Sequence, residues 1–296
     1  MEKKIMLIIN PMSGRARYRG YVANVLEIFS AGGYSATVYM TQHVDHARIL
    51  AQTNAEGYDI VACIGGDGTL AETIAGLMAL DNRPPVGYIP MGTANDMANT
   101  LGLPKSASRA AELILNGNPM PIDIGRFGDN YFVYIAAFGA FTEVSYSTPR
   151  GSKQALGHLA YVLEGMSRLP KITPYRLRLV CDDGTWIEGD FIFGGVTNTT
   201  SIAGFVKIKP DAVDLCDGKF ELILVKNPKH LGQTSQIFMD ILTQKYDREY
   251  VQILHAKSVR FMFDEDVPWT RDGESGGEHR DVQLSIIPAG VQIFVP

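Results

Sequence analysis

Gly65-Gly66-Asp67-Gly68-Thr69 is the stretch that decides the fold and most of the predicted chemistry. The apolar, β-branched run Tyr58–Ile64 before it is typical of a short buried strand. The segment after it, Leu70–Leu80, consists of good helix formers, and Glu72 suits a first helical turn. A strand, a glycine-rich turn and a helix predict backbone N–H groups that face an anion. We interpret the stretch as a site for nucleotide phosphates, with a plain tight turn as the alternative for this motif alone.

Two other predicted strands end in similar turns. Lys3–Ile9 is apolar and leads into Asn10-Pro11-Met12-Ser13-Gly14, and Val86–Pro90 leads into Met91-Gly92-Thr93-Ala94-Asn95-Asp96. Ligands of open α/β sheets bind at the carboxyl ends of the strands. Each turn alone has an ordinary structural explanation, because turns are rich in Gly, Asn and Asp. Three such turns on one chain favour a single ligand site.

These motifs carry a resemblance to a known family. NPMSG at 10–14, GGDGT at 65–69 and GTAND at 92–96 resemble the diacylglycerol kinase catalytic domain. More narrowly, they are similar to the bacterial soluble lipid kinases grouped with diacylglycerol, sphingosine and ceramide kinases. Pro210–Ala212 with Asp217–Lys219 resembles that family's P-x-A…DG segment, and Asp272-Gly273-Glu274 resembles its late Asp-Gly-Glu. The resemblance covers essentially all 296 residues.

The pattern of elements changes near residue 122. Before it, strands alternate with helical segments, which predicts a parallel sheet covered on both faces. After it, strand-like runs dominate and predict a mainly antiparallel β-sandwich. The expected helices are Arg19–Ala31, His43–Asn54, Leu70–Leu80, Ala107–Leu115, Gly151–Arg168 and Leu231–Thr243. The expected later strands are Asn130–Ala136, Tyr175–Cys181, Trp186–Val196, Lys219–Val225, Ser258–Phe263, Val282–Ile287 and Val291–Val295.

The predicted fold is therefore an α/β nucleotide-binding domain, residues 1–122, followed by a β-sandwich domain, residues 123–287. The resemblance implies that the first domain is similar to NAD kinases and phosphofructokinases. It also implies that the last strands, about residues 288–296, return to that first domain. In this family the second domain receives the lipid acceptor.

Composition narrows the class of protein. A net charge of −5 argues against a nucleic-acid partner, which would usually require a basic excess. The longest apolar run, Tyr131–Phe141, is shorter than a membrane-spanning helix requires, and no secretory signal is evident. Three widely spaced cysteines form neither a metal signature nor a disulfide framework, and Cys63 is expected to be a small buried hydrophobe. These features favour a reduced, cytoplasmic setting.

The resemblance implies transfer of the γ-phosphoryl of ATP to a lipid hydroxyl, with Mg²⁺ as the metal. The positions that it assigns to the ATP site are Asn10, Pro11, Met12, Ser13, Gly14, Thr41, Gly65, Gly66, Asp67, Gly68, Thr69, Glu72, Thr93, Asn95 and Asp96. Asp67 is the first candidate for a metal-linked or catalytic carboxylate. Asp96 is the second, and an ordinary helix N-cap is the alternative for it.

The second domain supplies further carboxylates. Asp214, Asp217 and the backbone of Lys219 match a magnesium site of the family, with a β-turn as the alternative. Asp123 is a candidate for the same network. The family places a proton acceptor within Asp272-Gly273-Glu274 (residues 272–274), and we favour Glu274 over Asp272.

The densest basic group is Arg15, Arg17 and Arg19, directly after the first phosphate turn. It can hold ATP phosphates or anionic lipid head groups. We expect a lipid substrate, peripheral contact with the inner face of the cell membrane, and no nucleic-acid partner; a homodimer is left open. The six histidines are dispersed and do not predict a zinc site.

Two alternatives remain open from the residues. An NAD kinase-like enzyme that acts on a small polar molecule would share the Gly-Gly-Asp-Gly stretch. A nucleotide-binding sensor with little turnover would share the fold, but it would have no need for Asp67, Asp96, Asp217 and Glu274 together. The sequence does not identify the lipid acceptor.

Overall fold

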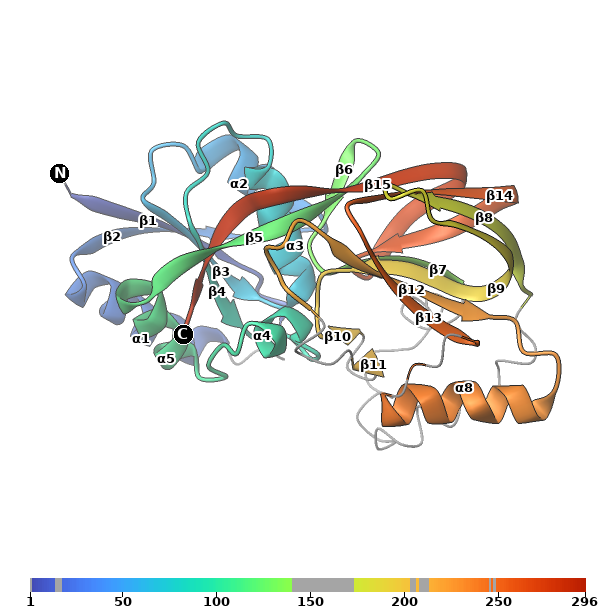
Figure 1. The fold of residues 1–296 in the computed structure, drawn as a ribbon. Helices are drawn as coiled ribbons and strands as arrows, with labels where there is room; N and C mark the ends of the chain where they lie inside the picture. The colour runs from blue at the N-terminus through green and yellow to red at the C-terminus, as the bar shows by residue number, and fades with distance from the viewer. Residues whose placement is uncertain are drawn as a thin grey trace. The chain divides into compact units, whose positions relative to one another are not determined.

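The structure, a computed structural model, describes residues 2–13, 18–139, 173–202, 206–207, 213–244, 246 and 249–296. The chain forms two compact units, Met1–Ile124 with Ile287–Pro296 (unit 1) and Gly125–Ile286 (unit 2). Unit 1 alternates strands and helices, whereas unit 2 is rich in strands (Figure 1). The predicted fold class, an α/β domain followed by a β-rich domain, is confirmed.

A parallel sheet forms the centre of unit 1. Its strands lie in the order β4 (Val86–Pro90), β3 (Ile60–Gly65), β1 (Lys3–Ile9) and β2 (Tyr34–Met40). The last part of β15 (Glu274–Val295) joins the sheet where Ile293 pairs with Val86 in parallel. β3, β4 and the part of β1 from Ile5 onward are buried, which explains their continuous apolar sequences.

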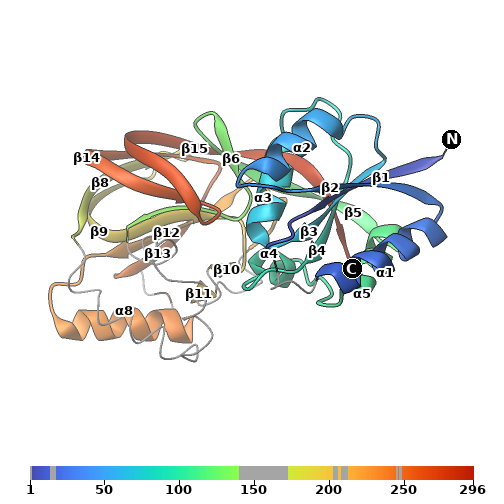
Figure 2. The ribbon, with the colours of Figure 1, turned by 180° about the vertical axis from the view of Figure 1, so that it is seen from behind.

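Helices cover both faces of this sheet. α1 (Tyr18–Ala31) and α5 (Ala107–Asn116) lie on one face, and α2 (His46–Asn54) and α3 (Asp67–Leu77) lie on the other (Figure 2). Alternate residues of β1 and β3 pack against α1 and α5 in a single hydrophobic cluster. The short helix α4 (Asp96–Thr100) follows β4. The predicted helices are present with shifted starts, since α2 begins three residues later and α3 three residues earlier than expected.

Unit 2 is built on an antiparallel sheet with the strand order β13-β12-β9-β7-β14-β15, and β8 pairs with both β9 and β14. The bounds of its strands are β7 Ile135–Gly139, β8 Tyr175–Cys181, β9 Trp186–Thr197, β12 Phe220–Lys226, β13 Val251–Ala256 and β14 Ser258–Arg271. The other elements of unit 2 are β6 (Asn130–Phe132), β10 (Ser201–Ile202), β11 (Val206–Lys207) and α8 (Leu231–Thr243). β5 (Asn118–Phe127) begins in unit 1 and ends in unit 2.

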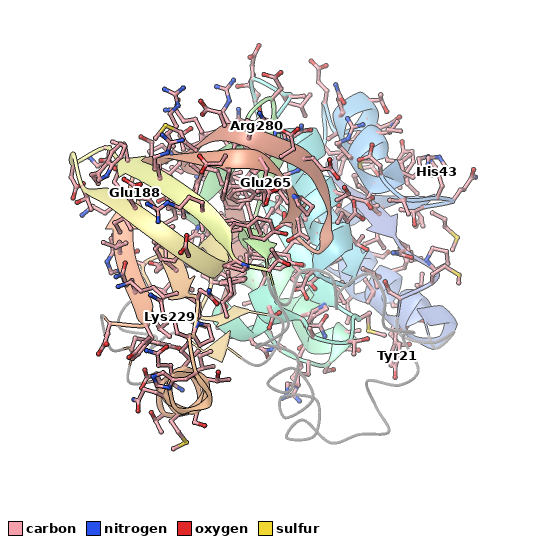
Figure 3. The ribbon with its side chains drawn as sticks, turned by 90° about the vertical axis from the view of Figure 1, so that its right-hand side faces the viewer. Tyr21, His43, Glu188, Lys229, Glu265 and Arg280 are labelled. Atoms are coloured by element: carbon pink, nitrogen blue, oxygen red, sulfur yellow. The ribbon has the colours of Figure 1, made fainter. Side chains whose placement is uncertain are left out.

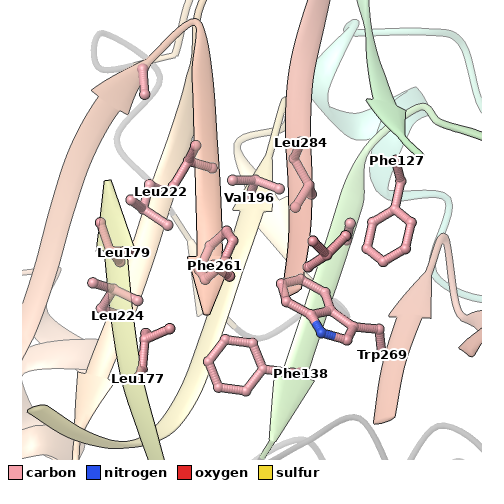
Figure 4. Packing of buried hydrophobic residues seen from close by; sticks show 14 of the residues in the cluster. Phe127, Phe138, Leu177, Leu179, Val196, Leu222, Leu224, Phe261, Trp269 and Leu284 are labelled. Atoms are coloured by element: carbon pink, nitrogen blue, oxygen red, sulfur yellow. The ribbon is translucent and has the colours of Figure 1, made fainter. Parts of the chain in front are cut away.

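The core of unit 2 combines aliphatic side chains with a group of packed aromatic rings (Figure 4). The rings of Phe138 and Phe261 both lie 5.1 Å from the ring of Trp269 between centroids. Burial of one such side chain stabilises a fold by about 1.5–3 kcal/mol. The side chains come from β7 and β14, so this cluster holds the two strands together.

The single strand predicted over Asn130–Ala136 is wrong, because the chain forms β6 and β7 with a break at Val133 and Tyr134. A carboxylate, described below, accepts hydrogen bonds from the backbone at this break. Two other differences concern length. β14 continues to Arg271, and the two strands predicted at 282–287 and 291–295 are parts of β15. The helix expected over residues 151–168 lies outside the described residues.

Candidate active site

The carboxyl ends of the strands of unit 1 are joined by short backbone hydrogen bonds. The N–H of Asn10 donates to the carbonyl of Ile64 at 3.0 Å, and the N–H of Met91 donates to the carbonyl of Gly65 at 2.7 Å. Thr41, after β2, donates to the carbonyl of Ile9 at 2.9 Å. The turns at residues 10–13, 65–69 and 91–96 therefore lie together at one edge of the sheet, as the sequence predicted.

Gly66 and Gly92 allow two of these turns to touch. A Cβ atom on Gly92 would lie 2.6 Å from the Cα of Gly66 and 2.7 Å from Oδ1 of Asn95. Neither backbone nor a bonded amide can move aside cheaply at that distance. The backbone–backbone approach explains why both positions are glycine.

Asn10 fixes the first turn. Its Nδ2 donates to Oγ1 of Thr69 at 3.1 Å, and its Oδ1 accepts the N–H of Met12 at 3.0 Å. Through these two hydrogen bonds the Asn10 amide secures the turn. The Met12 side chain is 79% exposed. Ser13 donates its N–H to the carbonyl of Asn10, and Gly14 lies outside the described residues.

Asp67 holds the start of α4. Its two carboxylate oxygens accept the backbone N–H groups of Asp96 and Met97, each at 3.1 Å. Burial raises the pKa of Asp67, and these backbone hydrogen bonds oppose the rise. Each oxygen retains a second lone pair, so one metal contact is still compatible with this arrangement.

Asn95, rather than Asp96, occupies the N-cap position of α4, in a left-handed conformation with φ 51°. Its Oδ1 accepts the N–H of Gly92 at 2.9 Å and its Nδ2 donates to the carbonyl of the same residue at 3.0 Å. Asp96 is the first residue of the helix and is 2% exposed. Thr93 is exposed at the same edge.

Glu72 secures the segment after β2. Its carboxylate accepts the N–H groups of Asp45 and Ala47, both at 3.0 Å, at the start of α2. Thr41 is half-buried just before this segment. Glu72 therefore positions the backbone beside the predicted ATP site, a role that the sequence did not indicate.

In unit 2, the carboxylate of Asp272 is held by three backbone N–H groups. Its carboxylate accepts the N–H groups of Val133, Tyr134 and Ile135 at 2.7, 3.0 and 3.1 Å. Burial raises its pKa to about 6, against the opposing effect of these three donors. Asp272 lies in a left-handed conformation with φ 49°. The hydrogen bonds of this side chain hold the backbone at residues 133 and 134, where the strand is interrupted.

Glu274 differs from Asp272 in its surroundings. Its side chain is exposed at the start of β15, and its backbone lies opposite that of Arg271 in the β14–β15 ladder. The turn needs Gly273, whose φ is 83°. In the Asp-Gly-Glu sequence, the Asp272 carboxylate is therefore buried against backbone N–H groups, whereas the Glu274 carboxylate lies at the surface.

The turn before β12 carries Asp214 and Asp217. Oδ1 of Asp214 accepts the N–H of Cys216 at 3.1 Å, and Oδ1 of Asp217 accepts the N–H of Lys219 at 2.9 Å. Both aspartates are exposed. Within the part of the chain that is described, no three His, Cys, Asp or Glu side chains are grouped so that they could hold a metal ion. The carboxylates have the chemistry that Mg²⁺ prefers, and carbonyl oxygens or water would have to complete the shell.

Glu221 was missed by the sequence analysis. It is buried on β12, one of its oxygens has no hydrogen-bond partner among the described residues, and burial raises its pKa to about 8. The negative charges of Asp217 and Asp214 add to this shift. A charged residue inside the apolar strand FELILVK was the available signal.

Three further expectations concern Asp123, the arginine group after the first turn, and membrane-spanning helices. Asp123 accepts the N–H of Ala289 at 2.8 Å within unit 1. Arg15 and Arg17 lie outside the described residues, and the side chain of Arg19 is not described. None of the helices in the described ranges is long and apolar enough to cross a membrane.

Comparison with known proteins places these features in a family. The family model described as "Diacylglycerol kinase catalytic domain" matches residues 4–127, and "YegS C-terminal NAD kinase beta sandwich-like domain" matches residues 138–295. A diacylglycerol kinase of Bacillus subtilis (strain 168) is 36% identical over 277 residues, 93% of this chain and 91% of the relative. A diacylglycerol kinase of Staphylococcus epidermidis (strain ATCC 12228) is 34% identical over 299 residues, 100% of this chain and 93% of the relative.

The fold is shared with solved structures. One from Bacillus anthracis (strain Sterne) superimposes with a TM-score of 0.83 at 24% identity, covering 99% of this chain and 95% of the other. At that identity the likeness concerns the fold alone. The family follows from the sequence relatives, which match over nearly the full length of both chains. The chain belongs to the diacylglycerol kinase catalytic-domain family.

Proposed function

We propose that this protein is an ATP-dependent lipid kinase that transfers the γ-phosphoryl group to the hydroxyl of a diacylglycerol-like lipid. The observation that carries the proposal is the junction of three polar turns at one edge of the unit 1 sheet, in a chain of this family. Open α/β sheets bind nucleotides at that edge. The protein works at the cytoplasmic face of the membrane, where its substrate resides.

The start of α3 supplies the phosphate seat. The first bond of this helix runs from the N–H of Leu70 to the carbonyl of Gly66, so the N–H groups between them precede the helical ladder. A Cβ atom at Gly68 would meet nothing within 4 Å, which leaves space for a ligand above the helix start. Backbone donors and the helix dipole favour an anion there.

Glu274 is the proton acceptor in this proposal. The lipid hydroxyl oxygen forms a bond to the γ-phosphorus, the bond from that phosphorus to the bridging oxygen of ADP breaks, and the hydroxyl proton passes to the Glu274 carboxylate. Asp272 is unsuited to this step, because it is buried and both of its oxygens accept backbone N–H groups. Asp67 and Glu72 hold the backbone that surrounds the nucleotide.

Mg²⁺ supplies charge neutralisation on the phosphates when it is bound. Asp67 is the residue at the nucleotide edge that would contact it. Asp214, Asp217 and the carbonyl of Lys219 are the residues of unit 2 that would hold a second ion, and their exposed position favours a weak site completed by water.

An acceptor panel tests the function. The protein is incubated with labelled ATP and Mg²⁺ in mixed micelles that contain dioctanoylglycerol, ceramide or sphingosine, and separately with NAD in solution. The proposal expects the fastest transfer to dioctanoylglycerol. Transfer to NAD instead would establish the small-molecule kinase, and stoichiometric ATP binding without any product would establish the sensor.

Replacing Gly68 with alanine should raise the KM for ATP at least about tenfold without loss of stability. The methyl group enters the space assigned to phosphate, while alanine favours the helix by roughly 0.5–1 kcal/mol over glycine. Steady-state kinetics and thermal unfolding measure the two effects. Gly20→Ala in α1 is the matched control, because a Cβ there also meets nothing within 4 Å. An unchanged KM for ATP in Gly68→Ala would contradict the assignment of phosphate to the start of α3.

Replacing Asp217 with alanine should raise the Mg²⁺ concentration needed for half-maximal activity several-fold. The change removes one of two carboxylates from the proposed unit 2 ion site and one hydrogen bond to Lys219. Mn²⁺ binding followed by electron paramagnetic resonance, in the absence of ATP, gives a readout independent of activity. Asp183→Ala, which removes a comparable turn carboxylate bonded to Thr185, controls for the loss of the turn. Identical Mn²⁺ binding in wild type and Asp217→Ala would show that Asp217 only stabilises the turn and does not bind an ion.

A further inference from the structure

Helix α8 has an unusual distribution of charge. Its sequence, LGQTSQIFMDILT, contains one charged residue in 13 positions, Asp240. That carboxylate points inward, since Asp240 is 4% exposed, and its Oδ1 accepts a hydrogen bond from Nε2 of Gln236 at 2.7 Å. Thr234 and Ile237 are buried on the same side of the helix. The charge that a surface helix normally presents to water is therefore directed away from it.

The outward side of α8 carries no charge among its described side chains. Its exposed residues are Gly232, Ser235, Gln236, Met239 and Thr243. Met239 lies near the middle of this face and is 50% exposed. We call these five residues the outer face of α8.

Another surface of unit 2 shows the opposite pattern. Exposed cross-strand ion pairs join Arg176 to Glu188, Arg178 to Asp264, Arg260 to Asp281 and Arg280 to Asp266. These pairs lie on β8, β9, β14 and β15, and Figures 1 and 2 show α8 on the far side of unit 2 from β14 and β15. A surface of this kind must stay hydrated. Unit 2 thus has one densely charged surface and, away from it, one uncharged helix face.

Basic side chains precede α8. Lys229 is exposed immediately before the helix (Figure 3). Lys226 is half-buried at the end of β12. A lysine near an anionic bilayer contributes about 1 kcal/mol of attraction. The net charge of the whole chain is −5, so any attraction to anionic lipid has to be local in this way.

We propose that the outer face of α8 rests on the lipid bilayer, with Met239 inserted among the acyl chains and Lys229 at the head groups. The inference rests on the proposed function, because a kinase for a membrane-resident lipid needs such a contact. The occupant is a lipid surface rather than a protein groove, since the face is uncharged, flanked by lysine, and contains a flexible methionine suited to disordered chains. Trp186, 55% exposed, is not part of the contact because Asp182 and Asp183 precede it.

Vesicle binding tests the proposal. Sedimentation with vesicles of phosphatidylcholine and phosphatidylglycerol compares wild type, Met239→Glu and Trp186→Glu. Met239→Glu is expected to weaken partitioning at least about tenfold, and Trp186→Glu, a charge added at an equally exposed apolar side chain, is expected to change it less than about twofold. Because the outer face is uncharged and Met239 inserts as an apolar side chain, wild-type binding should persist at 1 M salt, unlike a contact made only by arginines. Equal binding by all three proteins, or no wild-type binding, would overturn the proposal.

Two further measurements separate the lipid contact from misfolding and from self-association. Thermal unfolding of Met239→Glu should match wild type, and Ser235→Glu, a second substitution on the same face, should weaken binding in the same direction. Sedimentation velocity without lipid identifies a protein contact, and a dimer that only Met239→Glu disrupts would assign the face to a second copy instead. Turnover of dioctanoylglycerol below its micelle concentration should be equal in wild type and Met239→Glu. No turnover by wild type there would reject the kinase function, while the vesicle result would still decide the role of α8.

Discussion

Replacing Glu274 with glutamine is expected to lower kcat for lipid phosphorylation by about 10²–10⁴-fold and to leave thermal unfolding unchanged. Loss of a positioned general base has an effect of this size. The side chain is exposed at the start of β15, so the isosteric amide disturbs no packing. Steady-state kinetics with dioctanoylglycerol and a thermal melt measure the two quantities. Glu278→Gln, on the same strand and also exposed, is the matched control and should behave as wild type.

In contrast to Glu274→Gln, Asp272→Ala is expected to lower the stability of the protein. It leaves the N–H groups of Val133, Tyr134 and Ile135 without their acceptor. Each buried donor left unpaired costs about 1 kcal/mol or more, so we expect a loss of about 3 kcal/mol. For a unit of this size that corresponds to a fall in Tm of roughly 6–12 °C. A wild-type kcat in Glu274→Gln would contradict the assignment of Glu274 as proton acceptor. An unchanged Tm in Asp272→Ala would contradict the structural role of Asp272.

The second large effect is expected for Asp67→Asn. The sequence alone predicts loss of turnover with an intact fold, whereas the structure adds a local consequence. The asparagine amide can accept from Asp96 or Met97 but cannot accept from both, so α4 loses one hydrogen bond at its start. We expect kcat to fall at least about 10²-fold, because the carboxylate proposed to contact the metal is also lost. Faster amide hydrogen exchange at residues 96 and 97 should accompany it.

A matched variant separates the two roles of Asp67. Asp59→Asn replaces a carboxylate that accepts the N–H of Lys4 at 2.6 Å. Asp59 lies just before the start of β3, away from the carboxyl end of that strand. Its exchange effect should be local to that site, and its kcat should equal that of wild type. If Asp67→Asn retains near wild-type kcat while residues 96 and 97 exchange faster, Asp67 is a structural cap and the metal contact has to be assigned elsewhere.

Elements with strong local patterns could be predicted from the sequence. β1, β4, β8 and α8 have the predicted bounds, because apolar runs or helix formers end at clear turn residues. β5 was not predicted, since Pro119 and Pro121 interrupt its pattern. The break between β6 and β7 could not be predicted either. It depends on Asp272, which is nearly 140 residues away in the chain.

For the site, the sequence identified the three turns but not the tasks of their side chains. Asn10, Asp67 and Glu72 are all assigned to the predicted ATP site, yet each is bonded to backbone or side-chain groups of a neighbouring segment. Such tertiary partners have no sequence spacing that reveals them. The same holds for the difference between Asp272 and Glu274, where burial rather than residue type separates the two carboxylates.

The most direct test of the central claim is a single-turnover reaction of the protein with γ-labelled ATP, Mg²⁺ and dioctanoylglycerol. The lipid product and free inorganic phosphate are then separated and counted at each time point. The account predicts that the label moves to the lipid with one ADP formed per labelled lipid, and that Glu274→Gln slows this step. Label that appears as inorganic phosphate alone, or remains in bound ATP while the lipid stays unlabelled, would contradict it.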